Sequence, residues 1–166
     1  MRRFPSLALS LALLALLAGC AGPMRAWNIA PGATRDEVLA RAGRPSRVVP
    51  LPDGGQRLQY SMQPLGHYVF DVDLDAAGKV VRSRQVMTAA EFQRIVPGQW
   101  TREDVLREFG PPAWVDGVRS FEGEVWTYRW KEGNEPMFYW VYVDPRGVVQ
   151  RAHPGMEFIN APNDRN

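Results

Sequence analysis

The feature that most constrains this chain is an internal repeat. Residues 34–45 read TRDEVLARAGRP and residues 101–112 read TREDVLREFGPP, so six of the twelve positions are identical. A Pro-Gly pair precedes each copy, and an Asp-x-x-Gly turn follows each one, beginning at Asp75 and at Asp144. A repeat of this length that occurs twice predicts two similar small domains rather than a solenoid.

Each copy opens with the pattern of a short capped helix. An acid follows a threonine by three residues in both copies, as Thr34 with Glu37 and as Thr101 with Asp104. These pairs indicate a helix start, although only the first is a strict capping box. A glycine nine residues after each threonine, followed by a proline, predicts where each helix ends. A further helix is expected at residues 88–95.

Aromatic and β-branched segments follow each helix and predict antiparallel strands. The expected strands are Arg47–Val49, Gln56–Met62, His67–Leu74, Lys79–Val86, Trp114–Val115, Val125–Trp130, Phe138–Val143 and Val148–Ala152. The expected fold class is therefore α+β, with two tandem small units that each have two short helices followed by an antiparallel sheet of three to four strands. The first unit spans residues 27–87 and the second spans residues 88–156.

The N-terminus has the pattern of an export signal. Arg2 and Arg3 precede an apolar run from Leu7 to Ala18, which is shorter than the roughly 20 residues that a membrane-spanning helix needs. The sequence Leu17-Ala18-Gly19-Cys20 resembles the lipobox of bacterial lipoproteins. In that family the preceding peptide is removed and the cysteine is acylated on its sulfur and its new amino group. The alternative is an ordinary secretory signal with a chance cysteine.

The lipobox leads to several expectations about the ends of the chain. Residues 1–19 are expected to be cleaved and residues 20–26 to form a lipidated tether. Independently of the lipobox, residues 157–166 are expected to form a flexible tail, because they are polar. Cys20 is the only cysteine, so its acylation leaves no residue for a disulfide or a catalytic thiol. Ala21 follows it in place of the Asp that resembles an inner-membrane retention signal, which favours the periplasmic face of the outer membrane.

Charge and residue types argue against several classes of function. Without Arg2 and Arg3 the basic and acidic residues are equal in number, so nucleic-acid binding is not expected. The segment Asp71–Asp75 is superficially like a calcium loop, but Ala76 and Arg82 stand where that loop needs glycine and glutamate. His67 and His153 accompany no triad or zinc pattern. We therefore expect no metal, no cofactor other than the covalent lipid, and no enzyme activity.

The repeat also resembles a known family. The order Pro-Gly-x-Thr-x-x-x-Val-Leu-x-x-x-Gly-x-Pro, then aromatic strands and Asp-x-x-Gly-x-Val, looks like the SmpA/OmlA family. These are the BamE-type small lipoproteins of the outer-membrane β-barrel assembly machinery. The tandem layout is similar to that of β-lactamase inhibitor protein. The resemblance covers about residues 27–87 and 91–153.

The resemblance implies a function without chemistry. It implies a protein–protein interaction or scaffold module in outer-membrane protein assembly or envelope integrity, with barrel-assembly subunits among the partners. The first alternative is an enzyme inhibitor that captures its target with a concave sheet face. A second alternative is a hydrolase or a ligand carrier.

Strand alternation predicts which side chains of the first unit are buried. The apolar row of the third strand is expected in the core, and it consists of Phe70, Val72 and Leu74. The other row is expected to face water, because unpaired buried carboxylates are costly; it consists of Val69, Asp71 and Asp73.

The same register in the second unit predicts a binding surface. The core rows are expected to be Tyr139, Val141 and Val143, together with Trp126, Tyr128 and Trp130. The outward row is Phe138, Trp140 and Tyr142. An exposed aromatic row suggests a site for a protein partner. The alternative is that this row packs against the other repeat or the helix between the repeats.

Overall fold

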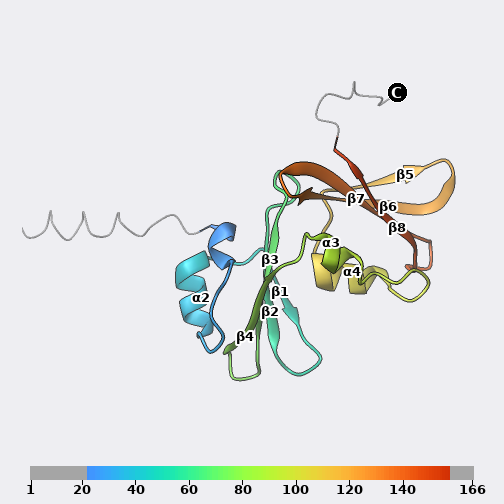
Figure 1. Ribbon diagram of the computed structural model, residues 1–166. Coiled ribbons are helices and arrows are strands. Elements are labelled where there is room, and N and C mark those ends of the chain that lie inside the picture. The colour runs from blue at the N-terminus through green and yellow to red at the C-terminus, as the bar shows by residue number, and fades with distance from the viewer. Residues whose placement is uncertain (1–21, 158–166) are drawn as a thin grey trace, which may run out of the picture.

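A computed structural model describes residues 22–157 (Figure 1). The predicted signal peptide, Cys20 and residues 158–166 lie outside the described residues. Within residues 22–157 no helix is long and apolar enough to cross a bilayer. In chain order the elements are η1 (Pro23–Ala26), α2 (Arg35–Ala42), β1 (Arg47–Pro50), β2 (Gln56–Ser61), β3 (Val69–Leu74), β4 (Val80–Gln85), α3 (Ala89–Phe92), α4 (Arg102–Phe109), β5 (Trp114–Val118), β6 (Phe121–Glu132), β7 (Glu135–Val143) and β8 (Val149–Met156).

The strands form two four-stranded antiparallel sheets, as an α+β fold requires. Sheet 1 has the order β1-β2-β3-β4 and sheet 2 has the order β5-β6-β7-β8. The expectation of two helices in each unit is wrong. One two-turn helix stands in each unit, preceded by the single 3-10 turn η1 in the first and by the four-residue α3 in the second. Pro31-Gly32 and Pro97-Gly98 interrupt the chain soon after these turns, so neither turn is extended.

Equivalent local contacts occur in both units. The Tyr60 hydroxyl donates to the Gly43 carbonyl at 3.0 Å, and the Tyr128 hydroxyl donates to the Gly110 carbonyl at 2.8 Å. Both glycines have a positive φ, 80° and 74°, which explains why glycine ends both helices. Each of these helices begins with a complete capping box, including the second one, where aspartate replaces glutamate.

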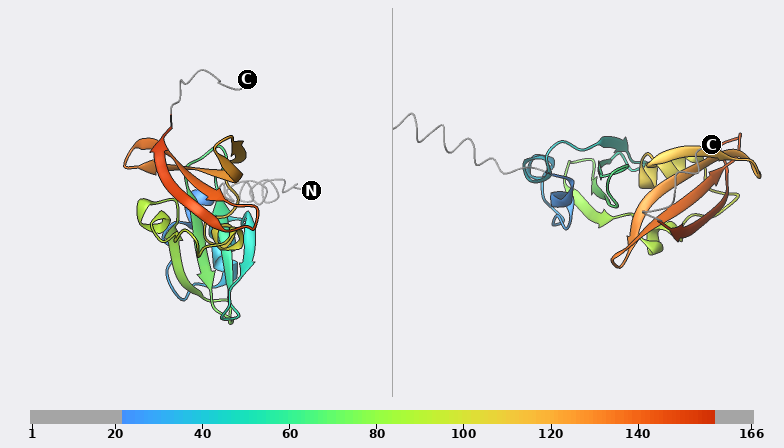
Figure 2. Two further views of the ribbon diagram at one scale, coloured as in Figure 1. Left: turned by 90° about the vertical axis from the view of Figure 1, so that its right-hand side faces the viewer. Right: turned by 90° about the horizontal axis from the view of Figure 1, so that it is seen from above.

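The helical segments and sheets are layered. Figures 1 and 2 show η1 and α2 on one side of sheet 1, and α3 and α4 in the angle between the two sheets. The first core lies between α2 and sheet 1 and includes Ala26, the last residue of the expected tether. The second core lies between the helices α3 and α4 and sheet 2. It also takes in three residues of the first unit, namely Val69, Val86 and Met87.

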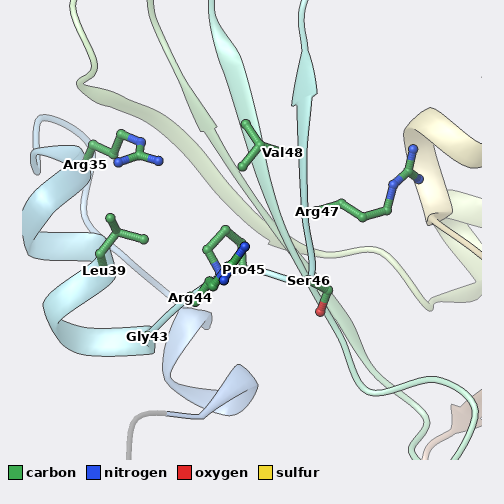
Figure 3. Close-up of a pocket in the computed structure, with 8 residues that line it drawn as sticks. All are labelled: Arg35, Leu39, Gly43, Arg44, Pro45, Ser46, Arg47 and Val48. Carbon is green, nitrogen blue, oxygen red and sulfur yellow. The ribbon is translucent and has the colours of Figure 1, made fainter.

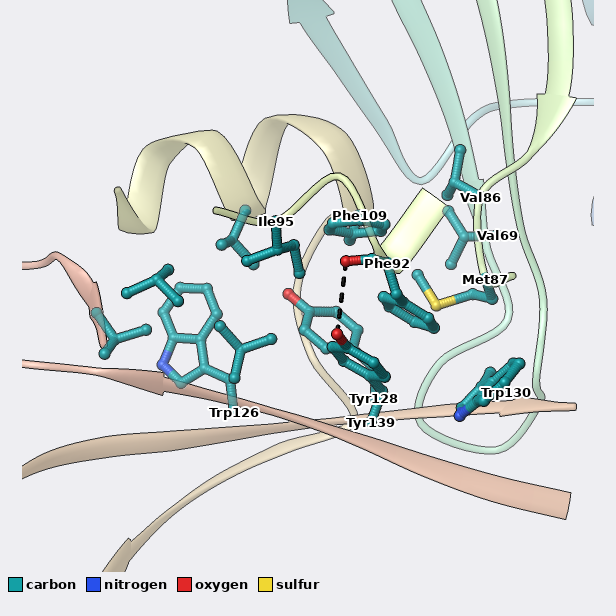
Figure 4. Packing of buried hydrophobic residues seen from close by; sticks show 14 residues of the cluster. Val69, Val86, Met87, Phe92, Ile95, Phe109, Trp126, Tyr128, Trp130 and Tyr139 are labelled. Carbon is teal, nitrogen blue, oxygen red and sulfur yellow. Dashed lines mark hydrogen bonds between the residues drawn. The ribbon is translucent and has the colours of Figure 1, made fainter. Parts of the chain in front are cut away.

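Aromatic packing dominates the second core (Figure 4). The rings of Phe92 and Tyr139 stack with centroids 4.0 Å apart, and the Tyr139 hydroxyl donates to the Phe92 carbonyl at 3.4 Å. The core assignment of both predicted rows of the second unit is confirmed, because all their members are buried: Trp126, Tyr128, Trp130, Tyr139, Val141 and Val143. The predicted core row of β3 is buried as well.

The prediction that the row of Val69, Asp71 and Asp73 faces water is wrong. Their exposed fractions are 0%, 0% and 3%, because α3 and α4 of the second unit lie over this face of sheet 1. The partners of the two aspartates are arginines on neighbouring strands, which the register places opposite them. Arg57 of β2 and Arg82 of β4 pair with Asp73, and Arg84 pairs with Asp71. These ion pairs offset the cost of burying the carboxylate of Asp73 and part of that cost for Asp71.

Candidate functional site

The outer face of sheet 2, opposite the second core, forms an open groove of about 370 Å³. We call it the aromatic groove. All four strands contribute to it, since alternate residues of each strand point to this face. Its lining consists of Trp114, Asp116, Val118, Val125, Thr127, Phe138, Trp140, Tyr142 and His153.

The rings of the groove contact one another. The centroid of Phe138 lies 5.3 Å from that of Trp114 and 5.8 Å from that of Trp140. The Trp140 ring also lies 5.3 Å from the ring of His153 and covers the backbone of Gly155. A Cβ atom on Gly155 would lie 2.1 Å from Cζ3 of Trp140, so glycine at this position is what leaves room for the ring.

Tyr142 is the most covered member of the predicted row, with an exposed fraction of 9%. Phe121 meets its ring edge-on at 5.3 Å, and the guanidinium carbon of Arg151 lies 3.8 Å from its centroid. That geometry is typical of a cation–π contact. Phe138 and Trp140 are partly exposed. The structure brings the three predicted residues together, and their partner-binding role stays a prediction.

Sequence reasoning missed the rest of the lining. Thr127 and His153 flank Trp140 on the neighbouring strands, and Val125 lies opposite Tyr142. The alternation of β6 contained a usable signal, because Thr127 lies between the core residues Trp126 and Tyr128 and must therefore point to the other face. The positions of Trp114 and His153 depend on strand register, which the sequence did not reveal.

A loop of the first unit reaches the Phe138 end of the groove. Arg129, which lies opposite Phe138 in the register, donates to the Leu65 carbonyl at 2.9 Å and pairs with Glu157. The Gln63 side chain donates to the Arg129 carbonyl at 2.7 Å. Leu65 itself is 88% exposed. The backbone of a loop in the first unit therefore borders this end of sheet 2.

The corresponding face of sheet 1 holds a buried charge network instead of rings. Arg57 donates to both carboxylate oxygens of Asp73, at 2.7 and 3.1 Å, and to the Arg107 carbonyl at 2.9 Å. Arg84 donates to Glu108 at 2.9 Å. The last carbonyls of a helix lack helical partners, and a cation there also complements the helix dipole. The network therefore holds the C-terminal end of α4 on sheet 1.

The two aspartates of this network titrate differently. Burial raises the pKa of Asp71 to about 7, although the nearby arginines act to lower it. Its Oδ2 atom lies 3.3 Å from Nε of Arg57 and accepts no hydrogen bond from the described residues. Burial also acts to raise the pKa of Asp73, but hydrogen bonds from Arg57 and Arg82 outweigh it and hold that pKa below its usual value.

A second hollow, of about 450 Å³, lies between α2 and β1 (Figure 3). Arg35 and Arg44 line it with exposed guanidinium groups. Figure 3 shows the side chain of Arg47 pointing away from it toward α4, where Nη1 donates to the Leu106 carbonyl at 2.9 Å. The guanidinium of Arg47 therefore belongs to the junction between the two units, although the residue also lines the hollow.

Neither a family model nor a curated protein matches the chain. Among solved structures it is similar to a DUF4309 family protein, YjgB, from Bacillus subtilis, with 16% identity, 75% of this chain and 79% of that chain covered, and a TM-score of 0.32. It is also similar to an extracellular protein containing a SCP domain from Bacillus anthracis, with 17% identity, 76% and 43% covered, and a TM-score of 0.29. Likeness at this level assigns no function.

Proposed function

We propose that the protein is a lipid-anchored module at the periplasmic face of the outer membrane that binds another protein through the aromatic groove and catalyses no reaction itself. The observation that carries this proposal is the contrast between the two sheets. Sheet 1 has its outer face covered by α3 and α4, whereas the same face of sheet 2 presents partly exposed rings. Exposed aromatic clusters of this kind are typical of protein interaction sites.

The anchor supports the same proposal. Gly22, the first described residue, is two residues from Cys20, a distance of at most about 7 Å in an extended chain. The segment that follows is folded onto the first unit, because Ala26 is fully buried. Acylation of Cys20 would therefore hold the first unit against the membrane and raise the effective concentration of the groove for partners there. The SmpA/OmlA resemblance makes barrel-assembly subunits the first candidates.

Site-specific photocrosslinking in the native host tests this proposal. A photoreactive amino acid replaces Trp140 in the groove, and a matched control replaces Val81, which is 52% exposed on β4 of the other sheet. We expect position 140 to give one discrete crosslinked species with an envelope protein, and position 81 to give none. Capture of a soluble hydrolase instead would favour the inhibitor alternative. Equal crosslinking from both positions, or none from position 140, would refute the groove as a binding site.

A further inference from the structure

The aromatic groove is the structural counterpart of a surface that is occupied in the first unit. The repeat places Thr127 at the position of Gln59 and Trp140 at the position of Asp71. The register agrees, because Gln59 lies opposite Asp71 and Thr127 lies opposite Trp140. The two faces therefore correspond residue by residue, and what covers one indicates what fits the other.

In the first unit this face holds the end of a helix. Arg47 and Arg57 donate to the carbonyls of the last turn of α4. Gly110, which ends that helix, approaches so closely that a Cβ atom on it would lie 2.4 Å from Oε1 of Gln59. Arg84 on β4 binds the acidic side chain of Glu108. Sheet 1 is thus a seat for a short helix with an acidic flank.

The aromatic groove is also long enough for a helix of this size that lies along it. Helix α4 has eight residues and so a length of about 12 Å. The distance along β7 from Phe138 to Tyr142 is about 13 Å for four residue steps. Val125 stands at the position of Arg57, so a helix in the groove would be held by apolar side chains rather than through its terminal carbonyls.

One positive charge stands at the flank of the groove. Arg151 lies opposite Tyr142, at the place that Arg82 has in sheet 1, and it is exposed. The two arginines have different surroundings, because Arg82 binds Asp73 of its own sheet, whereas the helix acid Glu108 is bound by Arg84, whose place His153 takes in sheet 2. The charge of Arg151 itself therefore favours an acidic residue on an incoming helix.

We propose that the aromatic groove seats a short amphipathic helix of a partner protein, with its apolar side toward the rings and an acidic residue toward Arg151. The proposal rests on the proposed function and specifies the shape and charge of the partner. A second copy of this chain is a poor occupant, because the repeat places Arg41 of α2 at the position of Glu108, and this charge would repel Arg151.

The first test uses a synthetic peptide and the full mature chain carrying Cys20→Ser, which is free of lipid. The probe is a stapled helix of about 14 residues with leucines on one face and a glutamate on its flank. This length corresponds to about three to four helical turns. Its control has the same composition with leucines at alternate positions, as in a strand. We expect the helical peptide to bind more tightly, Trp140→Asp to weaken it by at least about tenfold, and Val81→Asp to leave binding unchanged.

Charge reversal makes the test independent of folding defects. Arg151→Glu should weaken binding of the glutamate peptide by roughly fivefold, and a lysine in place of that glutamate should restore the affinity. Absence of this rescue would overturn the acidic flank, and no binding of the helical peptide to the unchanged protein would overturn the helix seat.

A second measurement separates this inference from the proposed function. In the species crosslinked from position 140, mass spectrometry locates the crosslinked residue of the partner, and we expect it on a helix. Attachment to a strand, tighter binding of the strand-patterned peptide, or a dimer in sedimentation that dissociates on Trp140→Asp would overturn the helix seat. Attachment to a strand, or tighter binding of the strand-patterned peptide, would still leave the groove as a binding site for another protein.

Discussion

Replacing Asp71 with asparagine tests whether burial controls proton affinity at the junction of the two units. The substitution keeps the size of the side chain and leaves an oxygen that can still accept from Nε2 of Gln59, which lies 3.1 Å from Oδ1. In the folded protein the pKa of Asp71 is raised from 3.8 to about 7. Between these two values the folded state retains a proton that the unfolded chain has released.

The sign of the pH dependence follows from this difference. The unfolded chain binds fewer protons than the folded protein between pH 4 and 7, so the contribution of Asp71 to stability falls as the pH rises through this range. This contribution to stability is fully present below the pKa that Asp71 has in the unfolded chain, and it is lost above the pKa that Asp71 has in the folded protein. Each pH unit corresponds to about 1.4 kcal/mol. From pH 5 to pH 8 the free energy of unfolding of Asp71→Asn should therefore gain about 3 kcal/mol relative to the unchanged protein.

Urea unfolding of the mature chain at pH 5, 6, 7 and 8 measures this difference. Asp73→Asn is the matched control, because it lies on the same strand and has a lowered pKa. Its contribution is lost only as the pH falls through the more acidic range, so its effect should be constant from pH 5 to 8. A constant effect of Asp71→Asn as well would show that Asp71 is ionised throughout and that its arginine neighbours outweigh burial.

Two further substitutions test the groove and the anchor. Gly155→Ala should displace the Trp140 ring and lower the free energy of unfolding by about 1–3 kcal/mol. The control Gly117→Ala should have a much smaller effect, because a Cβ atom on Gly117 meets nothing within 4 Å. Equal effects of the two substitutions in urea unfolding would contradict the close approach of Trp140 to Gly155. Cys20→Ala should abolish acyl labelling and release the protein from the membrane fraction, and a protein that still sediments with membranes would argue against the lipobox.

The parts of the fold that depend on near neighbours in the chain were predictable from sequence. Thr34 and Glu37 are three residues apart, and the glycine that ends each helix needs only its own backbone freedom. The strand positions followed from alternation and from turns. The expectation of two helices per unit failed because only the single turns η1 and α3 precede α2 and α4, and the sequence pattern did not indicate that these segments would be so short.

The candidate site was predictable only in part. Alternation along one strand was enough to bring Phe138, Trp140 and Tyr142 to one face. The groove also needs Trp114 and His153, whose positions depend on the register of three strand pairs. Register is set by pairing across the sheet, and a single strand does not contain that information.

The sequence by itself determined that this chain is built from two copies of one unit, because the repeated caps, turns and strand patterns act within each copy. Only the tertiary structure decided whether the outer face of each sheet is covered or exposed. In the first unit that face is buried under α3 and α4, so Asp71 and Asp73 are paired with arginines instead of water. In the second unit the same face remains an open groove. Burial depends on which distant segments meet, and no local pattern along the chain encodes that.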